Sequence, residues 1–498
     1  MTRRALVSLV VALAGAGVLT GGAVPALGGA APGPVAVIVH LDEPALGPTN
    51  QDLVGLGWNT GSSLDPVAAL EPRTVRIDAR LESLSTGYDS DADLLVYDEA
   101  KVKDLLGRVA EVRRIGAEPQ VILSYMPAWL GSPNAYGRDP TRMSPSDGDL
   151  WQRLIGEVVN LLATAESPAT RFEVWNEPDL PIFFQDWPPA FLDLARRTHQ
   201  AVADVEVEVG TDLQIGGPAA FFPDPLYIGA YVEEITGAGL PLDFVSWHWY
   251  GNTPFLGPDG AEDILPPYVL PLYPVIGQRN PITSPVAYAI QTDLVRDLVD
   301  GIVATRPGYD DIDLVIDEWN LSAGGYDLRH DTDEGAAFVL ASLMEMEAAG
   351  LDSADLYRGI GSDTPGDWGI ATATPDGTAD GGGRKPSWYA LDSWQRTAGA
   401  RRVVSGAEPL AGIFARASTS NSPEVHHVLL SSFVASGGSE RSVRVDFDGI
   451  DCAAGAEIAV LRLDGKAASA PIIVDGSTVT FDLPAQTSRW IRAACEVA

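Results

Sequence analysis

The stretch RFEVWNEP, residues 171–178, is a run of strand-forming residues that ends in a tryptophan, an amide, an acid and a proline. A second stretch, LVIDEWN at residues 314–320, is built the same way, as an apolar strand that ends at an acid and a tryptophan. Glutamates delivered at the C-terminal ends of parallel strands are typical of a (β/α)8 barrel, which carries its functional groups on that face. The two stretches therefore predict a barrel with Glu177 and Glu318 at the same end.

Two carboxyl groups are enough to cleave a glycosidic bond, because one protonates the leaving oxygen and the other attacks or stabilises the sugar carbon. A single glutamate after a strand is usually a solvated turn residue, so its neighbours decide the interpretation. Asn176 adds a neutral donor and acceptor beside the first acid. Pro178 favours an extended conformation at Glu177. The residues in this order favour a carbohydrate-cleaving site over an ordinary turn.

Several tryptophans follow predicted strands. We expect Trp175 and Trp319 to be exposed beside the acids, with flat apolar faces on which a sugar ring can pack. Trp129 and Trp368 are further candidates for sugar binding, as is Trp319 itself. The alternative for each is ordinary core packing, since aromatic residues dominate protein cores.

The chain has 498 residues and a formal net charge of −35. This length suggests two or three domains. The charge argues against nucleic acid or an anionic membrane as a partner, since both attract positive surfaces. It favours a neutral oligosaccharide or polysaccharide as the substrate. The six histidines show no zinc-ligand spacing, and residues 89–93 lack the glycine and glutamate of a calcium loop, so we expect no metal and no cofactor.

The N-terminus reads as an export signal. Arg3 and Arg4 precede an apolar stretch, residues 5–19, and small residues suited to a signal peptidase follow. The stretch is shorter than the roughly 20 residues of a membrane-spanning helix. We therefore expect residues 1–30 to be a cleaved signal peptide and the mature protein to be secreted, with no membrane attachment. Export and an even cysteine count favour a Cys452–Cys495 disulfide, with two buried thiols as the alternative.

The pattern along the chain predicts two structural domains after the signal. Between residues 51 and 400 strand-like and helical stretches alternate, which indicates an α/β fold, a (β/α)8 TIM barrel. A doubly wound open sheet is the alternative, but its glycine-rich phosphate turn is absent from the sequence. Residues 401–498 alternate in the manner of an antiparallel β-sandwich. Residues 31–50 contain a strand that we expect to join the sandwich.

The predicted elements can be stated by range. The eight barrel strands are expected at residues 53–58, 74–78, 119–125, 171–177, 213–217, 242–248, 313–318 and 353–358. Helices are expected at 101–115, 151–165, 189–205, 226–236, 291–304, 333–349 and 386–397. The segment 252–288 is rich in proline and aromatic residues, and we interpret it as a wall or lid of the cleft.

With these motifs in place, the chain resembles the clan A glycoside hydrolases, and among them most closely family 39, known for β-xylosidases and α-L-iduronidases. The resemblance covers roughly residues 50–400. It rests on the Asn-Glu-Pro and Asp-Glu-Trp-Asn motifs, on IGGPA at 215–219, on HWY at 248–250 and on KPSWY at 385–389. It implies that Glu177 is the acid/base and that Glu318 is the nucleophile of a retaining mechanism.

The supporting residues follow from this assignment. Asn176 is suited to bind the sugar 2-hydroxyl. Tyr250 and Arg76 are suited to hold Glu318 ionised and oriented, and His248 is suited to contact the sugar or the carboxylates. For Arg76 the alternative is a structural ion pair, and for His248 it is a satisfied core histidine.

The function predicted is a secreted retaining glycosidase on a neutral glycan, with an exo-acting β-xylosidase first. An arabinofuranosidase, another glycosidase, an endo-glycanase or a transglycosylase could use the same residues. A non-catalytic carbohydrate-binding surface protein built on the same barrel is the alternative from a different class. The sequence leaves the sugar, the anomeric configuration, exo or endo action and the oligomeric state open.

Overall fold

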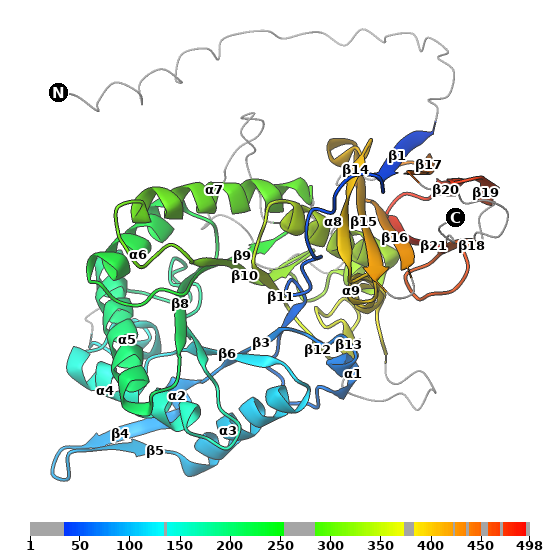
Figure 1. The fold of residues 1–498 in the computed structure, drawn as a ribbon. Helices are drawn as coiled ribbons and strands as arrows, with labels where there is room; N and C mark the ends of the chain where they lie inside the picture. The colour runs from blue at the N-terminus through cyan, green and yellow to red at the C-terminus, as the bar shows by residue number, and fades with distance from the viewer. Residues whose placement is uncertain are drawn as a thin grey trace, which may run out of the picture. The chain divides into compact units, whose positions relative to one another are not determined.

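The computed structural model describes residues 34–133, 137–252, 284–372, 383–421, 424–434, 438–449, 457–468 and 472–494. Eight parallel strands close into a barrel in chain order, so the predicted (β/α)8 fold is confirmed (Figure 1). These strands are β2 (Gly55–Gly57), β3 (Thr74–Asp78), β6 (Glu118–Leu123), β7 (Arg171–Val174), β8 (Gln214–Ala220), β9 (Phe244–Tyr250), β10 (Asp313–Asn320) and β11 (Ser353–Leu356). Residues 1–30, Cys452, Cys495 and all but the ends of 252–288 lie outside the described residues.

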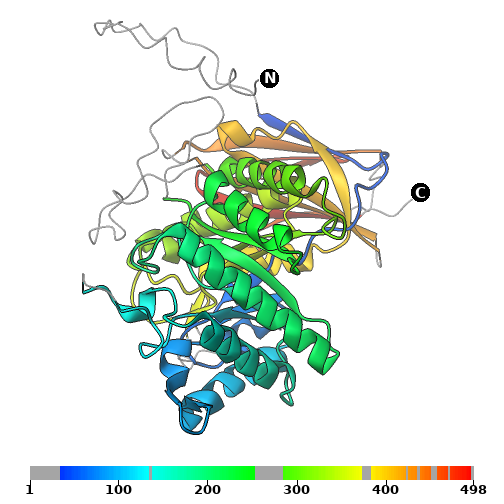
Figure 2. The same cartoon turned by 90° about the vertical axis from the view of Figure 1, so that its left-hand side faces the viewer.

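Helices surround the barrel, and each predicted helix overlaps an observed one (Figure 2). They are α3 (Glu99–Arg114), α4 (Gly148–Ala163), α5 (Pro188–Val209), α6 (Pro225–Gly237), α7 (Val286–Val303), α8 (Asp333–Ala348) and α9 (Pro386–Arg396). Helix α4 shows how the sequence specifies them. Its N-cap Asp147 accepts from the backbone N–H groups of Asp149 and Leu150. Trp151, Leu154 and other apolar residues at helical spacing are buried on one face.

Some elements were not predicted. After β3 the chain forms the short helix α2 (Leu81–Leu84) and a hairpin of β4 (Ser85–Asp89) and β5 (Leu94–Tyr97) before it enters α3. The acidic segment 89–93 is the turn of that hairpin. Other short elements are α1 (Asp65–Ala68), β12 (Ile360–Gly361) and β13 (Ala371–Thr372). Among the described helices, none is both long and apolar enough to cross a membrane.

The C-terminal region forms one nine-stranded sheet, which encloses its own apolar core of residues such as Val37, Val445 and Ile491. This confirms the predicted sandwich. Its strands, in sheet order, are β18 (Glu457–Leu461), β21 (Thr487–Ala494), β16 (Glu424–Ser432), β15 (Ile413–Asn421), β14 (Ala400–Ser405), β1 (Val35–His40), β17 (Arg441–Asp448), β20 (Thr478–Leu483) and β19 (Ile472–Asp475).

Strand β14, which the sequence did not reveal, links the two halves of this sheet. Its first residues pair with β15, and its last residues pair with β1. Strand β1 lies between β14 and β17 and runs parallel to β17, the one exception to the antiparallel pairing in this sheet among the described residues. The N-terminal strand segment is therefore hydrogen-bonded within the C-terminal sheet.

Helix α8 is buried on nearly all sides because the sandwich covers the face that it turns away from the barrel. The Ser431 hydroxyl donates to the carbonyl oxygen of Ala337 at 2.8 Å, and the rings of Phe338 and Phe433 meet edge to face. A buried ion pair also crosses here. Arg416 Nε of β15 lies 3.0 Å from Glu347 Oε2 of α8, and each side chain is only 4% exposed.

This ion pair gives a stability prediction. In Arg416→Met the Glu347 carboxylate stays buried but loses its cation, so unfolding should become easier by about 3–5 kcal/mol. The double variant Glu347→Met with Arg416→Met removes both charges and should regain much of that loss. Urea unfolding measures both changes. The exposed pair of Arg114 and Asp65 is the control, since Arg114→Met should cost about 0–1 kcal/mol. Equal losses in both single variants would contradict the prediction.

Candidate active site

Glu177 and Glu318 lie together at the C-terminal end of the barrel. Glu318 belongs to β10, and Glu177 follows β7 by three residues. A carboxylate oxygen of Glu177, an imidazole nitrogen of His248 and a carboxylate oxygen of Glu318 all lie within 4.8 Å of one another. Retaining glycosidases place their two carboxyl groups about 5–5.5 Å apart, whereas inverting enzymes leave a wider gap for water. The spacing suits a direct attack on the sugar by one of the two acids.

Glu318 is held by two donors from other strands of the barrel, the adjacent β9 and the more distant β3. Arg76 Nη1 of β3 donates to Glu318 Oε2 at 3.0 Å, and the Tyr250 hydroxyl of β9 donates to Oε1. Arg76 Nη2 also donates to Asn176 Oδ1 at 3.0 Å. The structure thus brings together Arg76, Asn176, Tyr250 and Glu318, which the sequence had proposed as parts of one site. Both oxygens of Glu318 are fixed in direction before any substrate binds.

Glu177 has a different environment. His248 Nδ1 lies 2.8 Å from its Oε1, and the backbone N–H of Glu177 donates to the carbonyl oxygen of Ala219 at 2.9 Å. The predicted extended conformation is wrong, because φ of Glu177 is +45°, in the left-handed region. The tertiary contacts with Ala219 and His248 outweigh the local preference that Pro178 imposes.

The two acids differ in which neighbouring groups counteract the rise in pKa that burial causes. Burial raises the pKa of Glu177 well above its usual value, and the charges of Glu318 and Asp179 raise it further. Burial also raises the pKa of Glu318, but Arg76 and the Tyr250 hydroxyl act in the opposite direction. The protonated form is therefore favoured more strongly at Glu177 than at Glu318. Asp179 is partly buried, and desolvation raises its pKa to about 7.

A layer of buried polar side chains lies beneath the two acids. Arg76 Nε donates to Glu173 Oε2 at 2.6 Å and lies 3.6 Å from Asp317 Oδ2. The Ser246 hydroxyl donates to Glu173 Oε1 at 2.8 Å. Gln120 Nε2 lies within hydrogen-bonding distance of both Glu173 and Asp317. Sequence reasoning assigned a role to Arg76 but none to Glu173, Asp317, Ser246 or Gln120. A signal was present, because charged side chains at alternate positions of an apolar strand, as at residues 171 and 173, must find partners inside the barrel.

The tryptophans depart most from expectation. Trp175 and Trp319 are fully buried, so the predicted exposure is wrong. Trp175 Nε1 donates to the carbonyl oxygen of Phe183, which anchors the segment after Glu177. Trp129 and Trp368 are partly buried, and their Nε1 atoms donate to the backbone oxygens of Ser85 and Ser322.

Of these rings, Trp368 has a link to the catalytic end. It meets the ring of Tyr357 edge to face at 5.5 Å. Burial, followed by the charge of Glu318, raises the pKa of Tyr357 to about 12, so this pair lies on the Glu318 side of the site.

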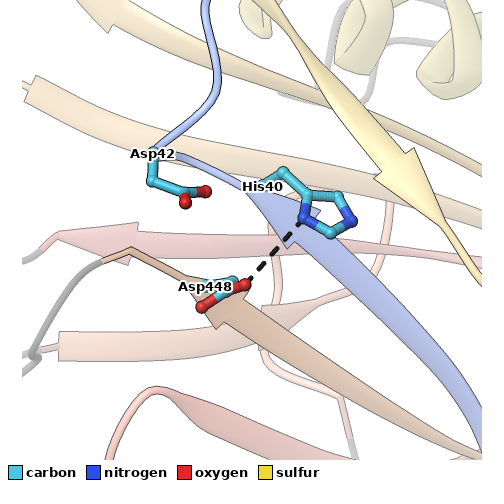
Figure 3. Close-up of side chains that lie close together, drawn as sticks. All are labelled: His40, Asp42 and Asp448. Carbon is cyan, nitrogen blue, oxygen red and sulfur yellow. Dashed lines mark ion pairs between the residues drawn. The ribbon is translucent and has the colours of Figure 1, made fainter.

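Two groups of side chains in the described residues have the spacing of metal ligands. In the first, Glu177, His248 and Glu318, the guanidinium of Arg76 already supplies a positive charge against Glu318, which disfavours a cation. The second, His40, Asp42 and Asp448, lies in the sandwich sheet (Figure 3). There His40 Nδ1 is 3.9 Å from Asp448 Oδ2, and both aspartates are exposed. Neither group is assigned as a metal site.

The fold and the pair of acids at its catalytic end indicate the class, a (β/α)8-barrel glycosidase. A family model described as "Glycosyl hydrolases family 39" matches residues 69–258. A β-xylosidase of Caldicellulosiruptor saccharolyticus is 24% identical over 275 residues, 53% of this chain and 49% of the relative. A second β-xylosidase, from Geobacillus stearothermophilus, is 27% identical over 206 residues, 40% of this chain and 36% of the relative. The matched region thus spans about half or less of these curated relatives.

Solved structures resemble the chain over nearly its full length. The family 39 enzyme of Xanthomonas axonopodis pv. citri has a TM-score of 0.68 and 17% identity, covering 95% of this chain and 100% of the other. A monomeric β-xylosidase of Caulobacter crescentus CB15 has a TM-score of 0.65 and 18% identity, covering 92% and 99%. These likenesses support the fold. The family model and the Xanthomonas structure thus both give glycoside hydrolase family 39 as what this chain resembles.

The proton on Glu177 gives a prediction that needs no substrate. Between the ordinary glutamate pKa of about 4.3 and the raised pKa of Glu177, the folded protein keeps a proton that the unfolded chain has released. Stability therefore falls as pH rises through this window. Glu177→Gln cannot lose that proton, so its melting temperature should exceed that of the wild type by a margin that grows with pH. Thermal unfolding from about pH 4 to 8 measures the margin.

The control for this measurement is Glu208→Gln, because the Glu208 side chain is exposed on α5. Its difference from the wild type should not change with pH. A margin for Glu177→Gln that stayed constant across the range would show that Glu177 is ionised in the folded protein.

Proposed function

We propose that this protein is a retaining glycoside hydrolase in which Glu318 is the nucleophile and Glu177 is the acid/base. One observation carries the assignment. Arg76 and Tyr250 both donate to Glu318, whereas the nearest polar partner of Glu177 is an imidazole nitrogen. A nucleophile must be ionised and fixed in direction, while a general acid must hold a proton at rest. The two surroundings meet these opposite needs.

The proposed reaction has two steps. In the first, Glu318 attacks the anomeric carbon while Glu177 gives its proton to the leaving oxygen, which forms a glycosyl ester on Glu318. Esterification removes the negative charge of Glu318, so one cause of the raised pKa of Glu177 disappears. In the second step Glu177 takes a proton from water as the water oxygen attacks the anomeric carbon, the bond from that carbon to Glu318 breaks, and Glu318 leaves as a carboxylate. Asn176, fixed by Arg76, is placed to bind the 2-hydroxyl of the sugar.

The substrate that we propose is a neutral glycan, with β-xylosides first and exo action. The names of the curated relatives and of the Caulobacter enzyme support xylosides. The net charge of −35 disfavours polyanionic glycans at long range. Arabinofuranosides and other neutral glycosides are the next candidates after xylosides. The structure of a glucosidase from Croceicoccus marinus has a similar fold, so glucosides are added to the test panel. We also propose export, from the N-terminal sequence, and a Cys452–Cys495 disulfide.

The two glutamates can be distinguished by kinetics. Glu318→Ala should nearly abolish turnover of every substrate. Glu177→Ala should lower kcat/KM by about 10²–10⁴ on substrates with poor leaving groups and far less on 2,4-dinitrophenyl glycosides, which need no acid. Azide should rescue the Glu177 variant with a product of retained configuration, because azide replaces water that needs a base. Rescue of the Glu318 variant with retained configuration would reverse the assignment, and full activity in both variants would show that neither glutamate is catalytic. Absence of turnover by the wild type would favour a binding protein.

The substrate proposal is tested by initial rates on matched p-nitrophenyl β-xyloside, α-arabinofuranoside, β-glucoside, β-galactoside and α-L-iduronide. We expect β-xyloside to be fastest, with single sugars released from xylo-oligosaccharides. A preference for iduronide would overturn the neutral substrate. Cuts within long chains would overturn exo action but leave the roles of the glutamates unchanged. The ratio of transfer products to free sugar separates a transglycosylase from a hydrolase.

A further inference from the structure

Two fully buried polar atoms beneath the acid pair face each other without another hydrogen-bond partner among the described residues. They are His248 Nε2 and Asp317 Oδ1, 3.5 Å apart. Both side chains are entirely inaccessible to solvent. A buried polar atom without a partner is costly, so the short gap between these two is best closed by a hydrogen bond between them. The other ring nitrogen of His248, Nδ1, lies 2.8 Å from Glu177 Oε1.

The charge state of the histidine decides the direction of these bonds. Burial, and then the nearby charge of Arg76, lower the pKa of His248 well below its usual value, so the ring is neutral and has one N–H. Asp317 Oδ2 faces two donors, with Arg76 Nε at 3.6 Å and Gln120 Nε2 at 3.5 Å. These donors favour an ionised Asp317, which can only accept. The single N–H of His248 must then be on Nε2, and Nδ1 must carry a lone pair.

We infer that Asp317 is a positioning residue that fixes the tautomer of His248 and thereby holds the acid proton on Glu177. The lone pair on Nδ1 accepts a hydrogen bond from the protonated carboxyl group of Glu177 and repels its ionised form. The opposite tautomer would place an N–H on Nδ1, which would donate to the carboxylate and stabilise it. Asp317 thus acts on the general acid through the ring, without contact with the substrate. The inference rests on the proposed roles of Glu177 and Glu318.

Other charged groups also act on Glu177, and all stay in place in the test. They are Arg76 of β3, Asp179 after β7 and Glu318 of β10, and the hydroxyls of Tyr125 and Tyr250 also interact with its charge. Glu173, Asp355 and Tyr357 interact with Glu318 or Arg76 instead. None of the described groups other than Asp317 lies within hydrogen-bonding or ion-pairing distance of His248 Nε2. A change at Asp317 therefore reaches Glu177 through the imidazole ring or through the charge of Arg76, and the Asp355 variant, which also changes the surroundings of Arg76, controls for the second route.

Asp317→Asn is the sharpest variant, because the surrounding donors dictate how the new amide lies. Its oxygen should face Arg76 and Gln120, which leaves the NH2 group toward His248 Nε2. That NH2 donates, so it requires a lone pair on Nε2 and moves the ring proton to Nδ1. Nitrogen-15 NMR of histidine-labelled protein distinguishes the two tautomers directly, with the His248 signals assigned by their loss in His248→Asn. We expect the Nε2–H tautomer in the wild type and Nδ1–H in Asp317→Asn.

The kinetic readout is the pH profile of kcat/KM on an aryl β-xyloside with a poor leaving group. With Glu177 more acidic, the alkaline limb should move down by about one unit or more, an approximately tenfold loss on that side. kcat/KM for 2,4-dinitrophenyl β-xyloside should change little, since its first step needs no acid. If Asp317 had only a structural role, the variant would lower kcat/KM for both substrates equally and at all pH values.

Asp355→Asn is the matched control. Asp355 is a buried acid of β11 that also acts on Arg76, but its bonded partner is Thr74. Its variant should keep the wild-type tautomer of His248 and the wild-type alkaline limb. An Nδ1–H tautomer of His248 in the wild-type protein overturns the inference, even if Asp317→Asn fails to fold. An equal shift of the alkaline limb in Asp317→Asn and Asp355→Asn also overturns it. If no glycoside is turned over, the proposed function fails, while the NMR result still decides the tautomer.

Discussion

The guanidinium group of Arg76 is the interaction on which the catalytic end of the barrel depends. It is buried, and it lies within 4.0 Å of carboxylate oxygens of Glu173, Asp317 and Glu318, which come from β7 and β10. Burial alone lowers the pKa of an arginine, but the charges of Glu173 and Glu318 reverse this and keep Arg76 positive. A cation and carboxylates taken out of water are each costly unless they are paired. Together they tie distant strands to one geometry.

The charge count at this point explains where the proton resides. One arginine cannot compensate every acid around it, because Glu173, Asp317, Glu318 and Glu177 all reach the same small volume. The first three lie within ion-pairing distance of Arg76, whereas Glu177 faces a neutral imidazole. Glu177 is the least compensated acid, so it is the one that stays protonated. In the proposed mechanism, the difference between acid and nucleophile follows from which carboxyl group the arginine reaches.

The sequence predicted the barrel and the acid pair because both follow from local patterns. Eight strand-like runs alternate with amphipathic stretches, and two of the runs end in glutamates with distinctive neighbours. What failed depends on tertiary contacts. The left-handed backbone of Glu177 is set by its bond to Ala219, and the burial of Trp175 is set by neighbouring aromatic rings such as Tyr125 and Phe184. The half-exposed strand β14 lacks a strong alternating pattern, so its role in linking the sheet halves was not visible in the sequence.

The end of β10 shows how backbone geometry determines chemistry at this site. Consecutive residues of a regular strand point to opposite faces, so Asp317 and Glu318 should not both enter the barrel. The pairing of β10 with β9 shifts register between Ile316 and Glu318, and its pairing with β11 shifts between Ile316 and Trp319. Such an irregularity redirects side chains, and β-bulges are common beside active sites. It allows Asp317 to reach His248 from below while Glu318 reaches Arg76 and Tyr250 above. A single irregular step in one strand thus supplies both the carboxylate suited to attack and the carboxylate that orients the histidine beside the acid.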